Sequence, residues 1–426
     1  NDAAVIGSAE NIPHDLGAEW MYDADVNVQQ DVLNEDGILG DGLWEDQGEF
    51  SSRPTAMEDG TTAYYRFTEA DGTTAFRMEN AKDWIEEVWT PFVNYREDNL
   101  DDLGGKSYGD AIDEYIEVEE WTDDEYLQFL NLLEDAKHLE HGTNDLDIAH
   151  DKFIDPTFQF DTVYMSSPGL GFGNVAAKYA ESRMDRTSLG AKVTEINSSL
   201  DDDHAVVKYT ENGAEKIVKA RTVLVTVSVG VLKKGNIEFV PPLPEWKQGS
   251  IDAIGFGVTN KCVMSWNDQE AMVWPEDDMW ILLATPDDES SGRWTTFSNP
   301  SKFKGVPSLT AWIGGNDAIA AESQSDEEIL AAVMTNLRFM FPDITEPDNV
   351  YISRWGQEEN VLGAYSYPSP GEDYYDDINN IAARLGKIYF AGEATSASGW
   401  ATTFGAWDTG EEQALEIATR LQASRK

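Results

Sequence analysis

The sequence predicts an α/β protein in which strands and helices are mixed, with enough residues for two domains. The chain has 426 residues, and a hydrophobic content of 41% supplies a sizeable core. Strand-like runs alternate with amphipathic helical runs over its second half. Near the end, the stretch from Ile388 to Gly410 has the pattern of a buried strand, a loop of small residues and the start of a helix. Together these observations favour a mixed fold that ends in a ligand-binding turn.

The individual elements follow from the spacing of apolar residues. From about residue 81 to 152 these residues recur at helical spacing, and Thr122 with Glu125 resembles a capping box. The letters "ENG" between two alternating runs predict a hairpin within 204–220. A second amphipathic helix is expected over 325–341, capped by Ser325. Further strands are expected at 191–196, 222–232, 258–266, 279–285, 308–315 and 349–356.

The chain is strongly acidic. It has 30 Lys and Arg residues against 80 Asp and Glu residues, a formal net charge of −50. Such a surface repels nucleic acid and anionic membranes, so no nucleic-acid partner is expected, and it attracts cations such as polyamines. Because the acidic residues are spread through the chain, they indicate chiefly a solvated surface, which fits a secreted, organellar-lumen or high-salt setting. No apolar run approaches the roughly 20 residues of a membrane span.

Few catalytic motifs are present. Cys262 is the only cysteine, so no intrachain disulfide forms, and the five histidines are scattered, so no metal site is expected. The run "GLGFG" from Gly169 to Gly173 imitates a dinucleotide fingerprint, but Asn174 stands where the last glycine is required. A turn before a packed helix is the favoured interpretation. The closing stretch, by contrast, offers backbone N–H groups to a phosphate or a flavin ring.

Four blocks of sequence resemble the flavin-containing amine oxidases, the family of polyamine oxidases and monoamine oxidases. The closing "GKIYFAGEAT" with "ATTFGAWDTGEEQAL" is similar to the family's C-terminal flavin motif, and its "ATTFGA" is closest to the polyamine oxidase branch. "HDLGAEW" resembles a segment beside the flavin. The run 221–266 and "WGQEENVLGAYSYPSPG" resemble the family's central block and its "WG…GSYSY" block. The four blocks occur in the family's order.

The resemblance implies a two-domain FAD-linked amine oxidase fold. An FAD-binding domain would comprise 1–25, 160–232 and 376–426, and a substrate-binding domain of mixed sheet and helices would comprise 26–159 and 233–375. The family opens with a βαβ unit carrying GxGxxG, and this sequence lacks that unit. Three explanations stay open: the sequence is a piece of a longer chain, an associated chain or segment supplies the unit, or the protein does not bind FAD.

The resemblance also assigns roles to particular residues. Lys261 matches the lysine that holds a water against the flavin and assists substrate deprotonation and oxygen reactivity; the strand pattern alone indicates a solvated edge-strand lysine. Glu393 matches the carboxylate that binds the ribityl–phosphate part of FAD; without the resemblance it is an acidic residue favoured by a helix N-terminus. The cofactor-binding residues implied are Gly17, Ala18, Trp20, Val193, Trp355, Gly392, Glu393, Ala401, Thr402 and Thr403.

A substrate channel lined by Tyr22, Tyr365 and Thr402 is implied as well. Trp355 and Tyr365 would present aromatic faces to an amine, although in a chain with 14 Trp a plain core position is the alternative. Tyr22 stands where animal polyamine oxidases usually carry a histidine, and Phe404 replaces the histidine of the family's HGA motif.

The function implied is FAD-dependent oxidation of a polyamine or related amine. A hydride would pass from the carbon next to nitrogen to the flavin, and hydrolysis would give an aldehyde and a smaller amine. Molecular oxygen would reoxidise the flavin and yield hydrogen peroxide. Three rivals stay open: a catalytically silent fold used as a structural or assembly subunit, an L-amino-acid oxidase, and an enzyme resembling histone demethylases.

Overall fold

The computed structural model divides the chain into two compact units. One comprises Asn1–Tyr179 with Val258–Trp355, and the other comprises Ala180–Gly257 with Gly356–Lys426. The structure describes residues 183–423 apart from 202, 285–292 and 372–373; before that it describes 4–5, 13–14, 20–22, 44–46, 62–67, 75–78, 91–92, 94–96, 98–99, 105–119, 163–166 and 180–181. The predicted mixture of strands and helices is confirmed. The predicted domain boundaries stay a prediction.

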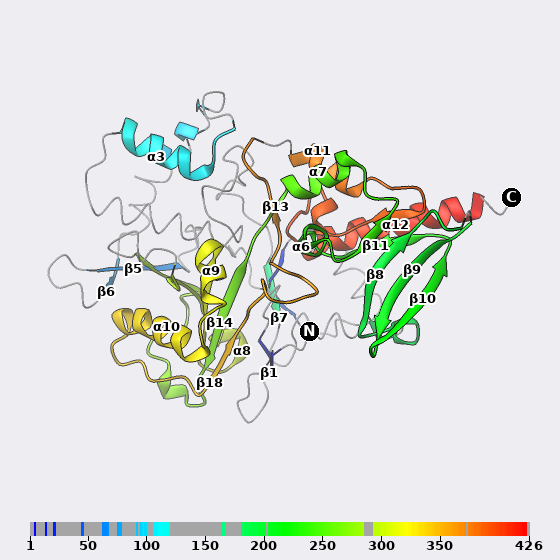
Figure 1. The fold of residues 1–426 in the computed structure, drawn as a ribbon. Coiled ribbons are helices and arrows are strands. Elements are labelled where there is room, and N and C mark those ends of the chain that lie inside the picture. Colours follow the sequence, from blue (N-terminus) through cyan, green and yellow to red (C-terminus); the bar gives the residue numbers. More distant parts are fainter. Residues whose placement is uncertain are drawn as a thin grey trace. The chain divides into compact units, whose positions relative to one another are not determined.

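The first unit, which begins at Asn1, is built on a seven-stranded mixed sheet. The order of its strands is β18-β14-β17-β16-β15-β5-β6, and all its pairings are antiparallel except that of β15 with β5. The bounds are β5 (Thr62–Phe67), β6 (Ala75–Arg77), β14 (Thr259–Ser265), β15 (Trp280–Ala284), β16 (Thr296–Ser298), β17 (Ser308–Gly314) and β18 (Asn349–Ile352). The order places β14 inside the sheet, between β17 and β18 (Figure 1).

One face of this sheet is covered by α10 (Asp326–Met340), the predicted amphipathic helix. It begins as predicted, because the Ser325 hydroxyl accepts the Glu328 N–H and the Glu328 carboxylate accepts the Ser325 N–H. Ile329 and Val333 of the helix share an apolar cluster with Cys262 of β14. Figure 1 shows α10 in yellow beside these strands. Because side chains alternate along a strand, the residues next to Cys262 face the other side of the sheet.

The remaining elements of the first unit are short. In α3 the capping box uses Ser107 with Asp110, while the box predicted at Thr122 lies outside the described residues. A three-stranded sheet has the order β3-β7-β4, and β1 pairs with β2. The bounds are α3 (Tyr108–Val118), α8 (Ser301–Lys304), α9 (Gly315–Ala321), η4 (Gln269–Ala271), β1 (Ala4–Val5), β2 (Pro13–His14), β3 (Trp20–Tyr22), β4 (Trp44–Asp46) and β7 (Val163–Ser166).

The second unit, which begins at Ala180, contains a four-stranded sheet of order β10-β9-β8-β12. The hairpin between β9 and β10 turns at Asn212 and Gly213, both with positive φ, as "ENG" predicts. Two further pairs join β11 to β20 in parallel and β13 to β19 in antiparallel orientation. The bounds are β8 (Ala191–Asn197), β9 (Ala205–Glu211), β10 (Ala214–Ala220), β11 (Val223–Val225), β12 (Glu238–Val240), β13 (Gly255–Phe256), β19 (Ser366–Tyr367) and β20 (Ile388–Phe390).

The strand predicted over 222–232 is wrong in its second half. The strand ends at Val225, and helix α6 (Val229–Lys234) follows. Ser228 caps this helix, because its hydroxyl accepts the Val231 N–H at 3.2 Å. Valine is a strand-forming residue, which is why a strand was predicted here. The Ser228 cap and the burial of Val229 and Val231 stabilise a helix instead.

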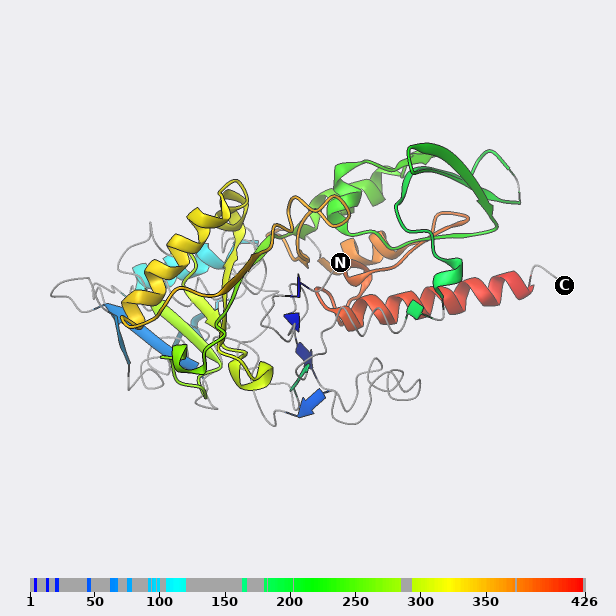
Figure 2. The same cartoon turned by 90° about the horizontal axis from the view of Figure 1, so that it is seen from below.

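The other helices of the second unit pack around a small apolar cluster. Ile251 of α7, Ile378 of α11 and Ala394 of η5 all belong to it. The long helix α12 runs without interruption, as Figure 2 shows in red. The bounds are η3 (Met184–Arg186), α7 (Glu245–Ala253), α11 (Tyr374–Ala382), η5 (Glu393–Thr395) and α12 (Thr403–Ala423). None of the helices in the described part of the chain is long and apolar enough to span a bilayer.

A buried lysine fixes the end of α11. The Lys247 side chain is 0% exposed, and its Nζ donates to the carbonyls of Asn380, Ile381 and Ala383 at 2.9, 2.5 and 2.8 Å. The amine also lies 3.7 Å from the centre of the Phe390 ring. Burial lowers the pKa of Lys247 to about 7, but three carbonyl acceptors require three N–H donors, which only the ammonium form supplies. This contact ties α7 to the C-terminal carbonyls of α11 and to β20.

Replacing Lys247 with Met tests this contact. Lys247→Met leaves the carbonyls at the end of α11 without their cation, so we expect the free energy of unfolding to fall by about 3 kcal/mol. Lys234→Met changes an exposed lysine at the end of α6 and serves as the matched control. Urea unfolding followed by circular dichroism measures both. Equal stability of the two variants would contradict the assignment.

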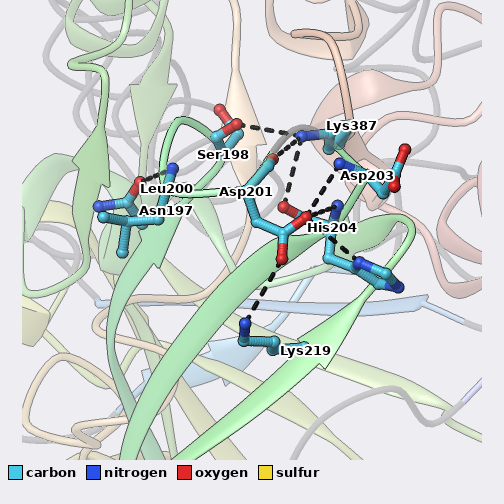
Figure 3. A network of polar contacts seen from close by, with 8 residues as sticks. All are labelled: Asn197, Ser198, Leu200, Asp201, Asp203, His204, Lys219 and Lys387. Carbon is cyan, nitrogen blue, oxygen red and sulfur yellow. Dashed lines mark hydrogen bonds and ion pairs between the residues drawn. The ribbon is translucent and has the colours of Figure 1, made fainter.

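A second lysine holds the loop between β8 and β9. Figure 3 shows Lys387 Nζ donating to the carbonyls of Ser198, Asp201 and His204 at 3.3, 2.5 and 3.3 Å. Lys387 directly precedes β20, so the loop is fastened to the start of that strand. Asn197 also stabilises this loop. Its side chain is 6% exposed, and its amide oxygen accepts the Ser199 and Leu200 N–H groups. The sequence Asn197-Ser198-Ser199 matches a glycosylation sequon, and its asparagine side chain is used within this turn.

Asp201 organises the same loop. One oxygen of its carboxylate accepts the N–H groups of Asp203 and His204 at 2.9 and 3.0 Å, and the other lies 3.4 Å from Lys219 Nζ (Figure 3). The Asp203 N–H bond, followed by those from His204, lowers the pKa of Asp201 to about 2. The ionised form is therefore favoured in the folded protein.

The pH dependence of an Asp201→Asn variant tests this assignment. A lowered pKa means that Asp201 stabilises the fold above its unfolded pKa of 3.8, and that this contribution is lost as the pH falls toward about 2. Wild type should therefore be more stable than Asp201→Asn at pH 5, and the difference should disappear near pH 2. Urea titrations across this range give the difference. Asp203→Asn, which changes an exposed neighbour in the same loop, is the matched control.

Candidate functional site

Glu393 is the centre of the predicted flavin motif in the second unit. It begins η5, just after β20 and Gly392. Its Oε2 accepts the Ser366 hydroxyl at 2.6 Å and the Ala401 N–H at 2.8 Å. Ser366 lies on β19 and is fully buried. One carboxylate thus joins β19, η5 and the residues that lead into α12.

The environment of Glu393 opposes its ionisation. Burial of the carboxyl raises the pKa of Glu393 above its usual range, although the bonds from Ser366 and Ala401 act in the opposite direction. Tyr374 of α11 lies within electrostatic range, and burial raises the pKa of its hydroxyl. The Tyr374 ring meets Trp400 edge-on, with centroids 5.4 Å apart. The flavin motif therefore holds a desolvated acid backed by aromatic rings.

The start of α12 is built from small residues, as the sequence predicts. Thr402 caps the helix, because its hydroxyl accepts the Gly405 N–H at 3.0 Å and donates to the Gly399 carbonyl at 2.6 Å. Gly405 must be glycine, since a Cβ there would lie 1.9 Å from the Gly399 carbonyl oxygen. Ala401 has φ of +61°, an uncommon conformation for alanine. Thr403, the first helical residue, is exposed.

Gly392 leaves room for a ligand. Its φ is +142°, and no atom lies within 4 Å of the position that a Cβ would take. The Thr409 hydroxyl accepts the Gly392 N–H at 3.1 Å, which fixes this glycine against α12. An open glycine at a strand end, beside a helix start made of small residues, is how folds bring backbone close to a phosphate or a ring system. These residues fit the FAD that the sequence motif implies.

Two other predicted residues of this unit lie elsewhere in it. Val193, on β8, is half-buried and packs against an apolar cluster that includes Phe390. Tyr365 is half-buried, and its backbone carbonyl accepts the Gly257 N–H at 2.9 Å. The predicted contacts of Val193 with the cofactor and of Tyr365 with the substrate stay predictions.

Lys261 lies in the first unit, on the interior strand β14. Its side chain is 3% exposed, so the interpretation as a solvated edge-strand lysine is wrong. The register sets it directly opposite Trp312 of β17, and its Nζ lies 4.2 Å from the centre of the Trp312 ring. A buried lysine needs such partners, because an ammonium group in an apolar interior is costly.

Asn260 connects Lys261 to Trp355. Its Oδ1 accepts the Ser353 hydroxyl at 3.2 Å and the Trp355 N–H at 2.9 Å. The Ser353 hydroxyl in turn accepts the Lys261 N–H at 2.8 Å, and the Ser353 N–H donates to the Lys261 carbonyl at 2.9 Å. The Asn260 amide donates to Glu322 at 3.0 Å. Asn260 thus binds the Trp355 backbone directly and reaches the Lys261 backbone through Ser353.

Sequence reasoning missed Trp312, Asn260 and Ser353. Asn260 adjoins Lys261 in "TNK", and a buried amide beside a site lysine is the signal that could have identified it. Trp312 lies 51 positions further along, which is 312 − 261, and only the register of β14 with β17 brings it opposite Lys261. Nothing local to the sequence indicates that pairing.

The remaining predicted residues are near the start of the chain. Trp20 and Tyr22 lie on β3, which pairs with β7, so that Tyr22 is opposite Val163. Gly17 and Ala18 lie outside the described residues, as do Gly169 to Gly173. Among the described residues no group of three His, Cys, Asp or Glu side chains forms a metal site.

Comparison with solved structures identifies the fold. The chain aligns with wild-type putrescine oxidase bound to putrescine at a TM-score of 0.66 and 18% identity, over 95% of this chain and 87% of that one. A second putrescine oxidase structure, a triple mutant, gives a TM-score of 0.69 and covers 97% of this chain and 90% of that one. The predicted two-domain α/β fold is thereby confirmed as that of an FAD-linked amine oxidase.

A family model described as flavin containing amine oxidoreductase matches residues 87–418. The chain belongs to this family, and FAD is the cofactor that the family and the fold imply. Among curated proteins, 224 residues are 38% identical to histone demethylase-like protein A of Aspergillus fumigatus, covering 50% of this chain and 20% of that protein. Polyamine oxidase 4 of Oryza sativa subsp. japonica is 34% identical over 233 residues, 55% of this chain and 45% of that enzyme. The match thus spans less than half the length of these relatives.

Glu393→Gln tests the electrostatics of the flavin motif. Glutamine keeps an acceptor for Ser366 and Ala401 but carries no charge. A raised pKa means that the folded wild type holds its proton more tightly, so its stability falls relative to the variant as the pH rises through that pKa. We therefore expect wild type to lose stability relative to the variant between pH 4 and pH 8 in urea titrations. A difference that does not vary with pH would contradict the assignment.

Proposed function

We propose that this protein is an FAD-dependent oxidase of polyamines or related amines. The overall reaction converts a secondary amine, oxygen and water into an aldehyde, a smaller amine and hydrogen peroxide. Bound FAD supplies the electron acceptor for the C–H bond that is broken. The single observation that carries the proposal is the burial of Lys261 on an interior strand, since the sequence resemblance matches this residue to the family's lysine.

Different residues of the chain have different proposed roles in this reaction. Gly392, Glu393 and the start of α12 would hold the cofactor, since they combine open backbone, a carboxylate and small residues. Lys261 would orient a water and move a proton between the substrate nitrogen, the water and its own Nζ. The proposed roles of Trp355, Tyr365, Tyr22 and Thr402 in lining the path of the amine rest on the sequence resemblance alone. The net charge of −50 attracts polycations and favours a secreted, luminal or high-salt setting.

A methylated lysine side chain is the second candidate substrate. The observation that favours it is the 38% identity with histone demethylase-like protein A, which is higher than the 34% with polyamine oxidase 4. The chemistry at nitrogen is the same, because both substrates lose a hydride from a carbon attached to an amine. A segment or second chain that contributes a βαβ unit is a further proposal, which reconstitution of the spectrum on its addition would test.

The visible absorption spectrum tests the proposed function. We expect flavin bands near ~450 nm in the purified native protein, bleached without oxygen by spermine and less by a dimethyl-lysine peptide. In Lys261→Met the bands should persist while bleaching slows by about 10²-fold, because a positioned proton-transfer group is lost. Lys234→Met is the control and should match wild type. A colourless protein, or a flavin that no amine bleaches, would contradict the proposal and favour a catalytically silent fold.

A further inference from the structure

Trp312 is the aromatic partner of Lys261. The two residues form a direct cross-strand pair between β14 and β17, so their side chains leave the sheet on the same face. The Lys261 Nζ lies 4.2 Å from the centre of the Trp312 ring, well inside the range of a cation–π contact. Cys262, the next residue of β14, belongs to the apolar cluster that includes residues of α10. Lys261 and Trp312 therefore occupy the sheet face opposite that cluster.

The Trp312 indole is fixed at its polar end and along its ring. Its Nε1–H donates to the Ser298 hydroxyl of β16 at 3.0 Å. Its ring packs on Trp280 of β15, with centroids 6.0 Å apart and planes inclined by 48°. Residues of β16 and β15 thus hold the Trp312 ring in the position where it contacts the Lys261 ammonium.

Trp312 differs from the structural tryptophans of the same unit. Trp266, Trp274 and Trp294 are 2 to 3% exposed and belong to the main apolar cluster as the structure describes it, and Trp312 does not. Trp312 is half-buried, while the other residues of β17 are buried. Trp312 thus lies outside the main apolar cluster, its N–H is hydrogen-bonded and its ring faces a lysine. Contact with Lys261 explains this placement better than core packing does.

We propose that Trp312 is a positioning residue: its ring holds the Lys261 ammonium in the position from which Lys261 would act in catalysis. A lysine has a flexible stem of four carbons, and fixing it costs side-chain entropy. The attraction of the ammonium to the ring offsets that cost and keeps Nζ in one position without neutralising its charge. The catalytic part of this inference rests on the proposed function; the placement of the ammonium does not.

The placement is tested by NMR of protein labelled with ¹³C at the lysine ε-carbon. A methylene carried over an indole ring has its proton resonance displaced upfield by the ring. We expect displaced signals from Lys247, which lies over the Phe390 ring, and from Lys261, and the one that is absent in Lys261→Met is assigned to Lys261. It should return to the ordinary lysine position in Trp312→Leu and stay displaced in Trp312→Phe, which keeps a ring. A Lys261 signal that does not move in Trp312→Leu would overturn the proposal.

The catalytic consequence is tested by a double-mutant cycle on the anaerobic bleaching rate at saturating amine. Trp312→Leu should slow bleaching about 10-fold in wild type, from the loss of one cation–π contact, with little change in the amine concentration for half-maximal rate. In a Lys261→Met background the same change should have almost no effect. Equal slowing in both backgrounds would show that Trp312 acts only through the fold, and would overturn the positioning role.

Two comparisons separate the outcomes. Trp274→Leu removes a buried tryptophan whose ring packs on Trp266, and should lower stability without coupling to Lys261 or moving its signal. If no amine bleaches the flavin, the proposed function fails, and the NMR experiment alone then decides whether Trp312 places the ammonium. Trp312→Phe should retain the rate within about 3-fold, because the ring face is kept.

Discussion

The need to satisfy buried charges is the constraint around which both units are built. An ammonium or carboxylate removed from water is tolerated only when other groups replace its hydration. Lys247 and Lys387 are each held by three backbone carbonyls, and Glu393 is held by a hydroxyl and a backbone N–H. Lys261 is held against an aromatic ring. These four groups fix where helices end, where loops return and where the candidate site residues lie.

The type of partner differs among these four charged groups. Three carbonyl groups at a helix end or in a loop accept all three protons of a lysine ammonium. Lys247 and Lys387 are bound in this way, which suits a structural role in holding the end of α11 and the loop between β8 and β9. An aromatic face attracts the charge of Lys261 and accepts no conventional hydrogen bond from it. Glu393 combines two donors with a desolvated position, so its ionisation depends on what else approaches it. Lys261 and Glu393 are the two of these four charges that lie in the predicted family motifs, and their roles in catalysis and cofactor binding stay predictions.

Much of the secondary structure followed from local sequence. The hairpin at Asn212, the capping box at Ser325 and the strand that carries Lys261 were all predicted, because turn residues, caps and alternation act over a few positions. The segment from Val229 was not, because strand-forming valines there are buried in a short capped helix. Glu393 and Ala401 were predicted as separate cofactor residues, and their mutual hydrogen bond was not, because it depends on how the loop between them folds.

The sequence by itself determined the family and the cofactor class, since these reside in short motifs of fixed order, and it singled out Lys261 as the lysine predicted to react. Only the tertiary structure decided what surrounds those residues. Strand register brought Trp312 opposite Lys261, and the path of the chain after β18 brought Ser353 and Trp355 onto Asn260. Pairing between strands distant in sequence depends on the burial of the whole sheet, so no local pattern encodes it. The partners of a buried charge are therefore determined by packing, while the charge itself is already visible in the chain.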